Sequence, residues 1–375
     1  MYVSAWPGLN PTLLFGASSN GGVPFPFNAS NQLYAYLARN LIYHLFRGLN
    51  QRGDTVVLVP DYHHGNEVRA LRASGVGLQF YPIRRNLQPD LETLARLCRS
   101  GPRVLFVIHY LGWPQPIGDL AQLCRDHGII LVEDCALSLL SESEGRPLGS
   151  FGDYSIFCLY KTLPVPNGGM LVQNGKFHDS QVPKFEPCSF PSLLGRTAEL
   201  VTEWIRTRND GAGRVLAAVK RQAGQALNSM QIGRLAVGDM GFDRSKVNID
   251  ISSLSLNLLP RLDYCRIRQK RRTNFQLLLE SLEGRATLLF TDLPEGVCPL
   301  FFPILVPDKA RAARILEHHG IRAIEFWNQG DPEAAGSSDV DFLRRHVLEI
   351  PIHQDVKPKH AAYMAQQILK HKLHF

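Results

Sequence analysis

The chain has 375 residues, of which 45% are hydrophobic and 20% charged. A chain of this length hides roughly three-quarters of its unfolded surface, which excludes disorder, collagen-like repeats and a small disulfide scaffold as its main description. Lysine and arginine exceed aspartate and glutamate by 41 − 34, a charge of +7 that favours an anionic ligand but is too diffuse to indicate nucleic acid.

The first half of the chain alternates between helical and strand periodicity. Helices are expected at 31–49, 65–74, 90–98 and 117–127. Strands are expected at 55–59, 78–83, 103–109, 129–133, 154–160 and 170–173. Continuous apolar strands separated by amphipathic helices are typical of βαβ units. The sequence therefore predicts an α/β fold, with a mostly parallel sheet between helices.

Beyond residue 175 the pattern indicates helices at 199–206 and 215–230, then a polar stretch around 239–250. A long basic helix at 261–282 leads to a second unit. In this unit a strand is expected at 300–306, a helix at 308–319, a strand at 321–327, an apolar stretch at 348–352 and a final helix at 357–371. We therefore expect a large domain over 1–260, including a helical segment at 176–260, and a small C-terminal α+β domain over 261–375.

The cysteines and the N-terminus bear on the compartment. Seven cysteines occur without a CxxC pair, and four lie in apolar stretches, which favours buried free thiols in a reducing environment. The N-terminal residues lack the basic start and apolar core of a secretory signal. No apolar run approaches the ~20 residues that a membrane span needs. We therefore expect a soluble cytoplasmic protein without a membrane partner.

The basic run Arg266–Arg272 could suggest nucleic acid, but in a helix its charges spread over most of the circumference. A solvated helix face is the preferred interpretation, and a role toward an anionic substrate is the alternative. The sequence has no P-loop or Rossmann glycine pattern in a strand–helix context. It also has no HExxH and no CxxC array, so we expect neither a nucleic-acid partner nor a catalytic metal.

Two polar side chains end neighbouring apolar strands. Asp134 follows Ile129-Ile-Leu-Val-Glu, at the strand end where open α/β sheets bind ligands. An unpaired buried carboxylate would cost several kcal/mol, so Asp134 should face a cation or a donor; a loop-bracing aspartate is the alternative. Lys161 ends the next strand, either as a solvated strand end or as an amine in a partly dry site that can attack a carbonyl.

Together these two residues suit pyridoxal phosphate (PLP). A lysine can hold its aldehyde carbon, and a carboxylate can keep the pyridine nitrogen protonated so that the ring accepts electrons. His109 and Tyr110 follow another strand end and are candidates for a pocket wall or substrate contact; a histidine satisfied by backbone is the alternative. Tyr160 should point to the opposite side of the strand from Lys161 and is expected to be structural.

Several motifs occur in a characteristic order. They are Gly53-Asp-Thr-Val-Val-Leu-Val-Pro60, Val107-Ile-His-Tyr-Leu-Gly112, Val132-Glu-Asp-Cys-Ala136, Gly152-Asp153 before Lys161, Gly168-Gly169 after it, and Phe302-Pro303, Gly320-Ile321 and Pro351. From about residue 31 to the C-terminus, and most weakly between 176 and 245, the chain resembles the DegT/DnrJ/StrS family of PLP-dependent sugar aminotransferases. The resemblance implies the aspartate-aminotransferase-like fold.

The resemblance also implies site roles. Lys161 would be the Schiff-base lysine and Asp134 the partner of the pyridine nitrogen. His64 falls where the family places an aromatic ring against the cofactor; a surface histidine is the alternative, and His63 beside it is indistinguishable by composition.

Asn40 lies where the family puts a helix N-terminus under the cofactor phosphate. The expected helix 31–49 runs through this position, so either the helix restarts near Arg39 or the assignment fails.

Three departures from the family pattern indicate a specialised subgroup. Where the family commonly has glutamine or histidine, this chain has Leu137, followed by Ser138, which is a further candidate for a substrate or pocket contact. The usual phosphate-binding serine is replaced by Ile156, so Ser155 or Cys158 is expected to substitute for it. The interval from aspartate to lysine is also about two residues shorter than usual.

The sequence thus predicts a PLP-dependent aminotransferase that takes an amino group from a small-molecule donor, glutamate in most of the family, to a keto sugar linked to a nucleotide. By resemblance it is a homodimer with shared active sites, and Asn248 is the candidate residue from the neighbouring subunit. One alternative is a PLP-dependent elimination, dehydration or decarboxylation on a related substrate. The other is a non-catalytic member of the same fold.

Overall fold

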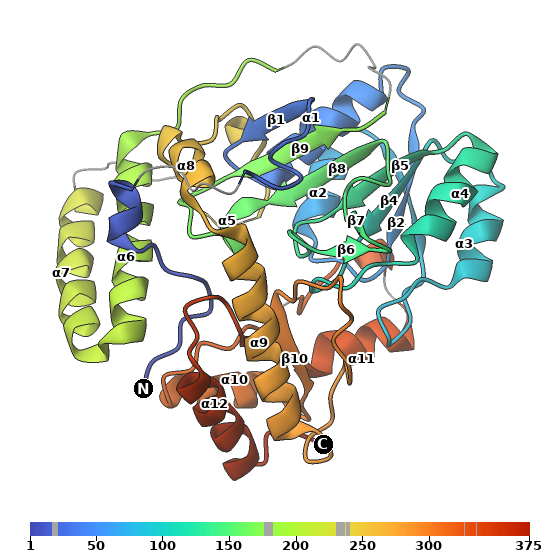
Figure 1. The fold of residues 1–375 in the computed structure, drawn as a ribbon. Coiled ribbons are helices and arrows are strands. Elements are labelled where there is room, and N and C mark those ends of the chain that lie inside the picture. The colour runs from blue at the N-terminus through green and yellow to red at the C-terminus, as the bar shows by residue number, and fades with distance from the viewer. Residues whose placement is uncertain (17–21, 176–182, 230–236, 238–240, 326, 335) are drawn as a thin grey trace.

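The computed structural model describes the whole chain except residues 17–21, 176–182, 230–236, 238–240, 326 and 335. A seven-stranded sheet lies at its centre (Figure 1). Across the sheet the strands are β1 (Gln32–Ala35), β9 (Gly169–Gln173), β8 (Tyr154–Cys158), β5 (Ile130–Asp134), β4 (Val104–Ile108), β2 (Val56–Pro60) and β3 (Gly77–Tyr81). The strands from β8 to β3 are mutually parallel, whereas β9 is antiparallel to both of its neighbours. The predicted α/β fold with a mostly parallel sheet is confirmed.

The central strands of the sheet are mostly apolar, and helices cover the faces of the sheet. Every residue of β4, β5 and β8 is buried, as continuous apolar runs predict for a parallel sheet with helices on its faces. The helices of this part are α1 (Ala38–Leu49), α2 (Asn66–Ala73), α3 (Leu91–Cys98), α4 (Ile117–His127) and the short α5 (Leu159–Thr162). Helix α1 packs against β8, β9 and α2. The helices predicted at 65–74, 90–98 and 117–127 are confirmed.

The helix predicted over 31–49 is wrong in its first half. Residues 32–35 form the edge strand β1, antiparallel to β9, and α1 begins only at Ala38. A four-residue strand is too short to show its own periodicity, and Leu33, Leu37 and Leu41 mimic a helical spacing of four. The partner that satisfies the backbone of β1 lies far away in sequence.

Two further strands are shorter than predicted. Strand β8 ends at Cys158, opposite Gly169 of β9, and the chain turns at once into α5, so Lys161 stands on a helical turn and not on a strand. The strand predicted at 321–327 is reduced to single bridges, from Ile321 to Val3 and from Ile324 to Glu349; residue 326 lies outside the described residues.

The remaining elements follow in chain order. They are the hairpin β6 (Glu142–Ser143) and β7 (Arg146–Pro147), α6 (Phe190–Arg208), α7 (Asp210–Ser229), α8 (Ser253–Leu258), α9 (Tyr264–Leu282), β10 (Phe301–Leu305), α10 (Lys309–His318), α11 (Ser338–His346), β11 (Val347–Pro351), α12 (Pro358–Lys370), and 3-10 turns at Pro11–Leu14, Arg244–Lys246, Leu259–Arg261 and Pro332–Ala334. Met230, the predicted end of the helix 215–230, lies outside the described residues.

The C-terminal elements gather beside the large sheet. Helix α9 packs on α12, and β10 pairs antiparallel with β11 (Figure 1). The first residues of the chain pack here as well, because Val3 bridges to Ile321. A domain boundary at 260/261 stays a prediction. Within the described residues, no helix is both long and apolar enough to cross a membrane, and all seven cysteines are free thiols.

A buried carboxylate fixes the loop that leads into β8. Glu133 is fully buried, and its oxygens accept the backbone N–H groups of Gly149, Phe151 and Gly152 at 2.6–2.9 Å. His109 Nε2 lies 3.0 Å from the same carboxylate. Because His109 Nδ1 accepts the N–H of Gln115, the proton is on Nε2 and is donated to Glu133.

Glu133→Ala should lower the free energy of unfolding by about 3–5 kcal/mol, because it leaves several buried donors without an acceptor. Glu133→Gln should cost less, because its amide oxygen still accepts. Urea unfolding followed by tryptophan fluorescence measures both. A midpoint for Glu133→Ala equal to that of the wild type would contradict this account of the loop.

Candidate active site

A cavity of about 500 Å³ lies at the carboxyl ends of the parallel strands. Its lining includes the last residues of β4, β5 and β8, which are Ile108, Asp134 and Cys158. Other parts of the lining come from the start of α1, the segment between β2 and α2, helix α6, the N-terminal residues and the segment after α10. This volume and position are typical of a small-molecule site in an open α/β sheet.

Asp134 and Lys161 face this cavity together. Asp134 is the last residue of β5, and Lys161 follows the adjacent strand β8 by three residues. Asp134 is 6% exposed, and its Oδ1 accepts the N–H of Ala136 at 2.9 Å. The positive charge of Lys161 acts on the Asp134 carboxyl, so the two groups lie within electrostatic reach of each other.

Burial raises the pKa of Asp134 to about 7, and the nearby negative charge of Glu67 adds to this effect. The Ala136 N–H, Lys161 and His64 oppose it. Glu67 lines the same cavity and accepts the N–H of His64 at 2.7 Å. The cavity therefore holds a carboxyl group that titrates near neutral pH and is stabilised by any positive charge placed beside it.

The two adjacent histidines have different surroundings. His63 is fully buried, stacks on Phe80 with ring centres 5.7 Å apart, and accepts the N–H of Asp331. His64 lines the cavity and meets the edge of Trp327. Sequence composition could not separate them, but their environments do.

The N-terminus of α1 borders the cavity through Leu37, Ala38 and Arg39. A helix end of this kind presents free N–H groups and a positive dipole to an anion. Asn40 points elsewhere, because its Nδ2 donates to the carbonyl of Lys246 at 3.0 Å. A Cβ at Gly169 would collide with the backbone of Ala38, so glycine lets β9 pass directly beside this helix end.

The structure separates the two candidates for the missing serine. Cys158 lines the cavity, whereas Ser155 is buried in β8 close to Gly149. Residues three apart in a strand point to opposite faces, so both could not serve. The expectation that Tyr160 is directed away from the site is wrong: the chain leaves the strand after Cys158, and Tyr160 lines the cavity on α5.

Four other candidates, His109, Tyr110, Ser138 and Asn248, are not among the residues that line the cavity. His109 is held by Glu133 and Gln115. Tyr110 is buried and donates to the carbonyl of Tyr62 at 2.7 Å. Ser138 is buried beside the cavity residue Leu137.

Asn248 accepts the N–H of Glu186 through its carbonyl. Its predicted role, as a residue supplied by a neighbouring subunit, stays a prediction.

The sequence interpretation missed several charged and aromatic groups of the cavity. They are Arg39, Arg196, Arg322, Glu67, Glu199, Trp6 and Trp327. Most lie on helices or on irregular segments, where a charged residue is usually solvated. Glu67, three residues after His64, and Arg39, directly before Asn40, stand close enough to residues already singled out to have been candidates.

The group His109, Glu133 and Cys135 has the composition of a metal site. Its ligand atoms are used internally, because both ring nitrogens of His109 and both oxygens of Glu133 have hydrogen-bond partners. Burial, with the charge of Glu133, also raises the pKa of the Cys135 thiol well above its ordinary value. The cluster is a structural network.

Solved structures identify the fold as that of the PLP-dependent aminotransferases. Helicobacter pylori PseC, an aminotransferase involved in the biosynthesis of pseudoaminic acid, has a TM-score of 0.68 with 15% identity over 98% of both chains. Sugar aminotransferase CalS13 from Micromonospora echinospora has a TM-score of 0.66 with 16% identity, covering 98% of this chain and 99% of that one. At such identities the likeness shows the fold alone.

Residues 40–200 match the model of the DegT/DnrJ/EryC1/StrS aminotransferase family, which confirms the family resemblance over that segment. GDP-perosamine synthase of Vibrio cholerae is 32% identical over 130 residues, 34% of this chain and 35% of the relative. dTDP-4-dehydro-2,3,6-trideoxy-D-glucose 4-aminotransferase of Saccharopolyspora spinosa is 33% identical over 121 residues, 32% and 31% of the two chains. The matches therefore span about a third of the length of these relatives.

Replacement of Asp134 should stabilise the cofactor-free protein in a pH-dependent way. Because the folded state keeps the Asp134 proton up to about pH 7, while the unfolded chain releases it near 3.8, Asp134 lowers stability as the pH rises through that window. Asp134→Asn keeps an oxygen for the Ala136 N–H and should raise the free energy of unfolding by up to about 4 kcal/mol at pH 8. The gain should be smaller at pH 5 and absent below pH 4.

Urea unfolding at pH 5 and pH 8 measures this difference, with the exposed Asp292→Asn as the matched control. An equal effect of Asp134→Asn at both pH values would contradict the raised pKa.

Proposed function

We propose that this protein is a PLP-dependent aminotransferase that moves an amino group from an amino acid, glutamate in the first place, to a keto sugar linked to a nucleotide. The observation that carries the proposal is the placement of Lys161 and Asp134. Asp134 ends β5, Lys161 lies on the turn that follows the adjacent parallel strand β8, and both line one cavity of ligand size. The names of the relatives, both of which act on nucleotide-linked sugars by their titles, support the substrate class.

The residues of the cavity suit the aldehyde, ring nitrogen, ring face and phosphate of PLP. Lys161 supplies the amine for the aldehyde carbon, Asp134 a carboxylate for the ring nitrogen, and His64 an imidazole for the ring face. The first turn of α1, the side chain of Arg39 and the cavity residue Cys158 suit the phosphate. When bound, PLP supplies an electron sink that stabilises negative charge on a carbon next to its imine nitrogen.

The chain's own side chains then have separate tasks. Burial and the charge of Glu67 raise the pKa of Asp134 to about 7, and this carboxyl would hold the ring nitrogen of PLP in its protonated form, since a positive charge offsets the cost of ionising Asp134. The amine of Lys161 is the base within the cavity that accepts the proton from the α-carbon of the amino donor and later returns it. The leucine and isoleucine side chains at 37, 42, 108, 137 and 324 limit the access of water to these groups.

The charges of the cavity suit an anionic acceptor. Arg196 and Arg322 line it on elements other than the sheet, and Arg196 is held 2.9 Å from Glu199. Guanidinium groups bind diphosphate and carboxylate oxygens with fixed geometry. A nucleotide-linked sugar carries such a diphosphate, and an amino donor carries such a carboxylate.

The proposal includes a homodimer with shared active sites in the cytoplasm. The family resemblance supports the dimer, and Asn248 is the residue that we propose the neighbouring subunit supplies. Seven free thiols, five of them buried, are compatible with a reducing compartment.

Incubation with PLP, followed by borohydride reduction and peptide mass mapping, should place a pyridoxyl group on Lys161. Addition of L-glutamate before reduction should release 2-oxoglutarate and abolish the labelling. Lys161→Ala should take up no reducible cofactor, and Lys161→Arg, which keeps the charge, serves as the matched control for folding.

An adduct on another lysine would overturn the site. Labelling of Lys161 without release of 2-oxoglutarate would favour an elimination, dehydration or decarboxylation. Failure to take up PLP would favour a non-catalytic member of the fold.

A further inference from the structure

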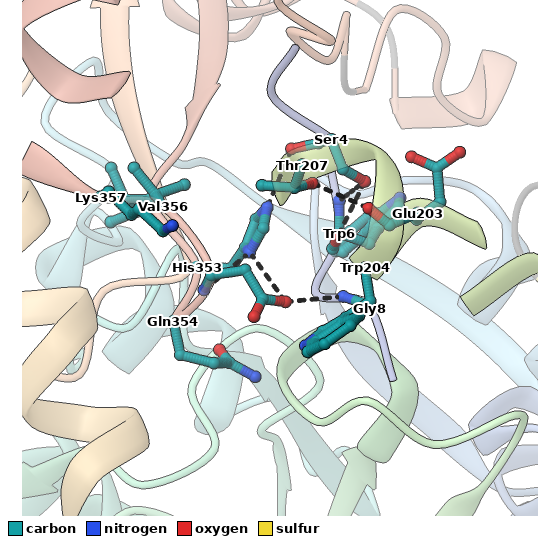
Figure 2. Close-up of polar contacts among 12 residues, drawn as sticks. Ser4, Trp6, Gly8, Glu203, Trp204, Thr207, His353, Gln354, Val356 and Lys357 are labelled. Carbon is teal, nitrogen blue, oxygen red and sulfur yellow. Dashed lines mark hydrogen bonds and ion pairs between the residues drawn. The ribbon is translucent and has the colours of Figure 1, made fainter. Parts of the chain in front are cut away.

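The first residues of the chain form an N-terminal arm, residues 2–9, which runs between α6 and the turn at 353–357 (Figure 2). The arm pairs with the segment after α10: the N–H of Val3 donates to Gly320, and the N–H of Arg322 donates to Val3. One end of the arm is therefore attached directly beside Arg322, a residue of the cavity lining.

A histidine and an aspartate hold the middle of the arm. His353 is 1% exposed, and its Nδ1 accepts the N–H of Asp355, so the proton is on Nε2 and is donated to the carbonyl of Ser4 at 2.9 Å. Asp355 Oδ2 accepts the N–H of Gly8 at 2.9 Å, and its other oxygen lies 3.2 Å from Arg208 of α6. Figure 2 shows His353 and Gly8 at these contacts, between the arm and the turn.

Helix α6 closes the other side of the arm. Tyr2 donates to Glu203 at 2.6 Å, and the N–H of Leu9 donates to Leu200 at 3.0 Å. A Cβ at Gly8 would overlap the backbone of Trp204, so only glycine allows this approach. The arm is thus held by contacts to helix α6, to the turn at 353–357 and to the segment after α10.

Trp6 lies between these attachments. The hydroxyl of Ser4 donates to the carbonyl of Trp6 at 2.8 Å and accepts its N–H, which sets the local backbone. The half-buried indole meets Phe301 edge to face, with ring centres 5.0 Å apart. Ala5 and Trp6 both line the cavity that holds Lys161.

The residues that line the cavity form two sets, which come from different parts of the fold. The groups suited to PLP stand at the ends of the sheet strands and at the start of α1, whereas Trp6, Arg322 and Ile324 come from the arm and from the segment to which it is tied. A substrate that reacts at Lys161 must occupy the space between these two sets. The indole of Trp6, packed against Phe301, offers that substrate an apolar ring surface.

We propose that Trp6 is a specificity-determining residue, whose indole stacks on a ring of the nucleotide-linked acceptor. The inference rests on the proposed function. Both a sugar ring, which presents C–H groups on its face, and a nucleobase can pack on an indole. Neighbouring Arg322 also lines the cavity; its guanidinium lies 2.6 Å from Glu317, and it would exchange this exposed ion pair for one with the diphosphate that joins the two rings.

The test separates the two half-reactions of the PLP-loaded enzyme. Trp6→Ala should raise the KM for the acceptor about 10- to 100-fold, the range expected for loss of one stacked ring. The rate with L-glutamate alone and the absorbance of bound PLP should stay within about twofold of the wild type. Trp6→Phe keeps an aromatic face and should restore most of the acceptor affinity.

The acceptor probes are GDP- and dTDP-linked 4-keto-6-deoxy sugars, and the matched inhibitors are GDP and dTDP. If Trp6→Ala weakens the binding of the keto sugar but not that of the nucleoside diphosphate, the ring that stacks on the indole is the sugar. If it weakens the binding of both ligands equally, the ring that stacks on the indole is the nucleobase. An unchanged KM and unchanged inhibition would overturn the proposal.

Tyr2→Phe is the control for the arm itself, because it removes the bond to Glu203 without touching the cavity lining. It should lower the melting temperature and leave the acceptor KM unchanged. An equal rise of KM in Tyr2→Phe and Trp6→Ala would overturn a specific role for the indole. Release of 2-oxoglutarate without turnover of either keto sugar would overturn this inference alone, whereas no release would overturn the proposed function.

Discussion

The geometry of the cavity depends on a pair of adjacent acids at the end of β5. Successive residues of a strand point to opposite faces, so Glu133 and Asp134 are directed away from each other. Glu133 accepts backbone and imidazole hydrogen bonds that fix the loop before β8. Asp134 enters the cavity. Lys161 follows β8 by three residues. The buried carboxylate of Glu133, which fixes the loop into β8, therefore sets the position of Lys161 relative to Asp134.

The sequence was sufficient for the parts of the fold whose signal is local. Buried strands β2, β4, β5 and β8 are continuous apolar runs, and their separation by helices predicts their parallel arrangement. The edge strand β1 and the bridges of Ile321 and Ile324 depend on partners elsewhere in the chain. Short segments of this kind have no periodicity of their own, which is why the sequence pattern predicts a helix where β1 lies.

In the candidate site, too, the sequence predicts what depends on local pattern and misses what depends on distant contacts. Asp134, Lys161 and His64 stand at or just after strand ends, so the topology alone brings them to one edge of the sheet. His109 occupies an equivalent position, but its ring is bonded to Glu133, which no pattern in the sequence reveals. The arginines and Trp6 reach the cavity through packing between distant segments, and local sequence carries no signal for that.

The N-terminal arm couples the position of the C-terminal elements to that of α6. Its contacts to Gly320 and to Asp355 join the start of the chain to its last hundred residues, and its contacts to Leu200 and Glu203 join it to α6. A shift of the C-terminal elements relative to α6 must therefore break hydrogen bonds of the arm or carry the indole of Trp6 with it. Since Lys161 stands on the turn α5, directly after β8, and Trp6 stands on the arm, the width of the cavity is set by packing remote from the reacting groups, and a tightly fixed arm keeps that width constant.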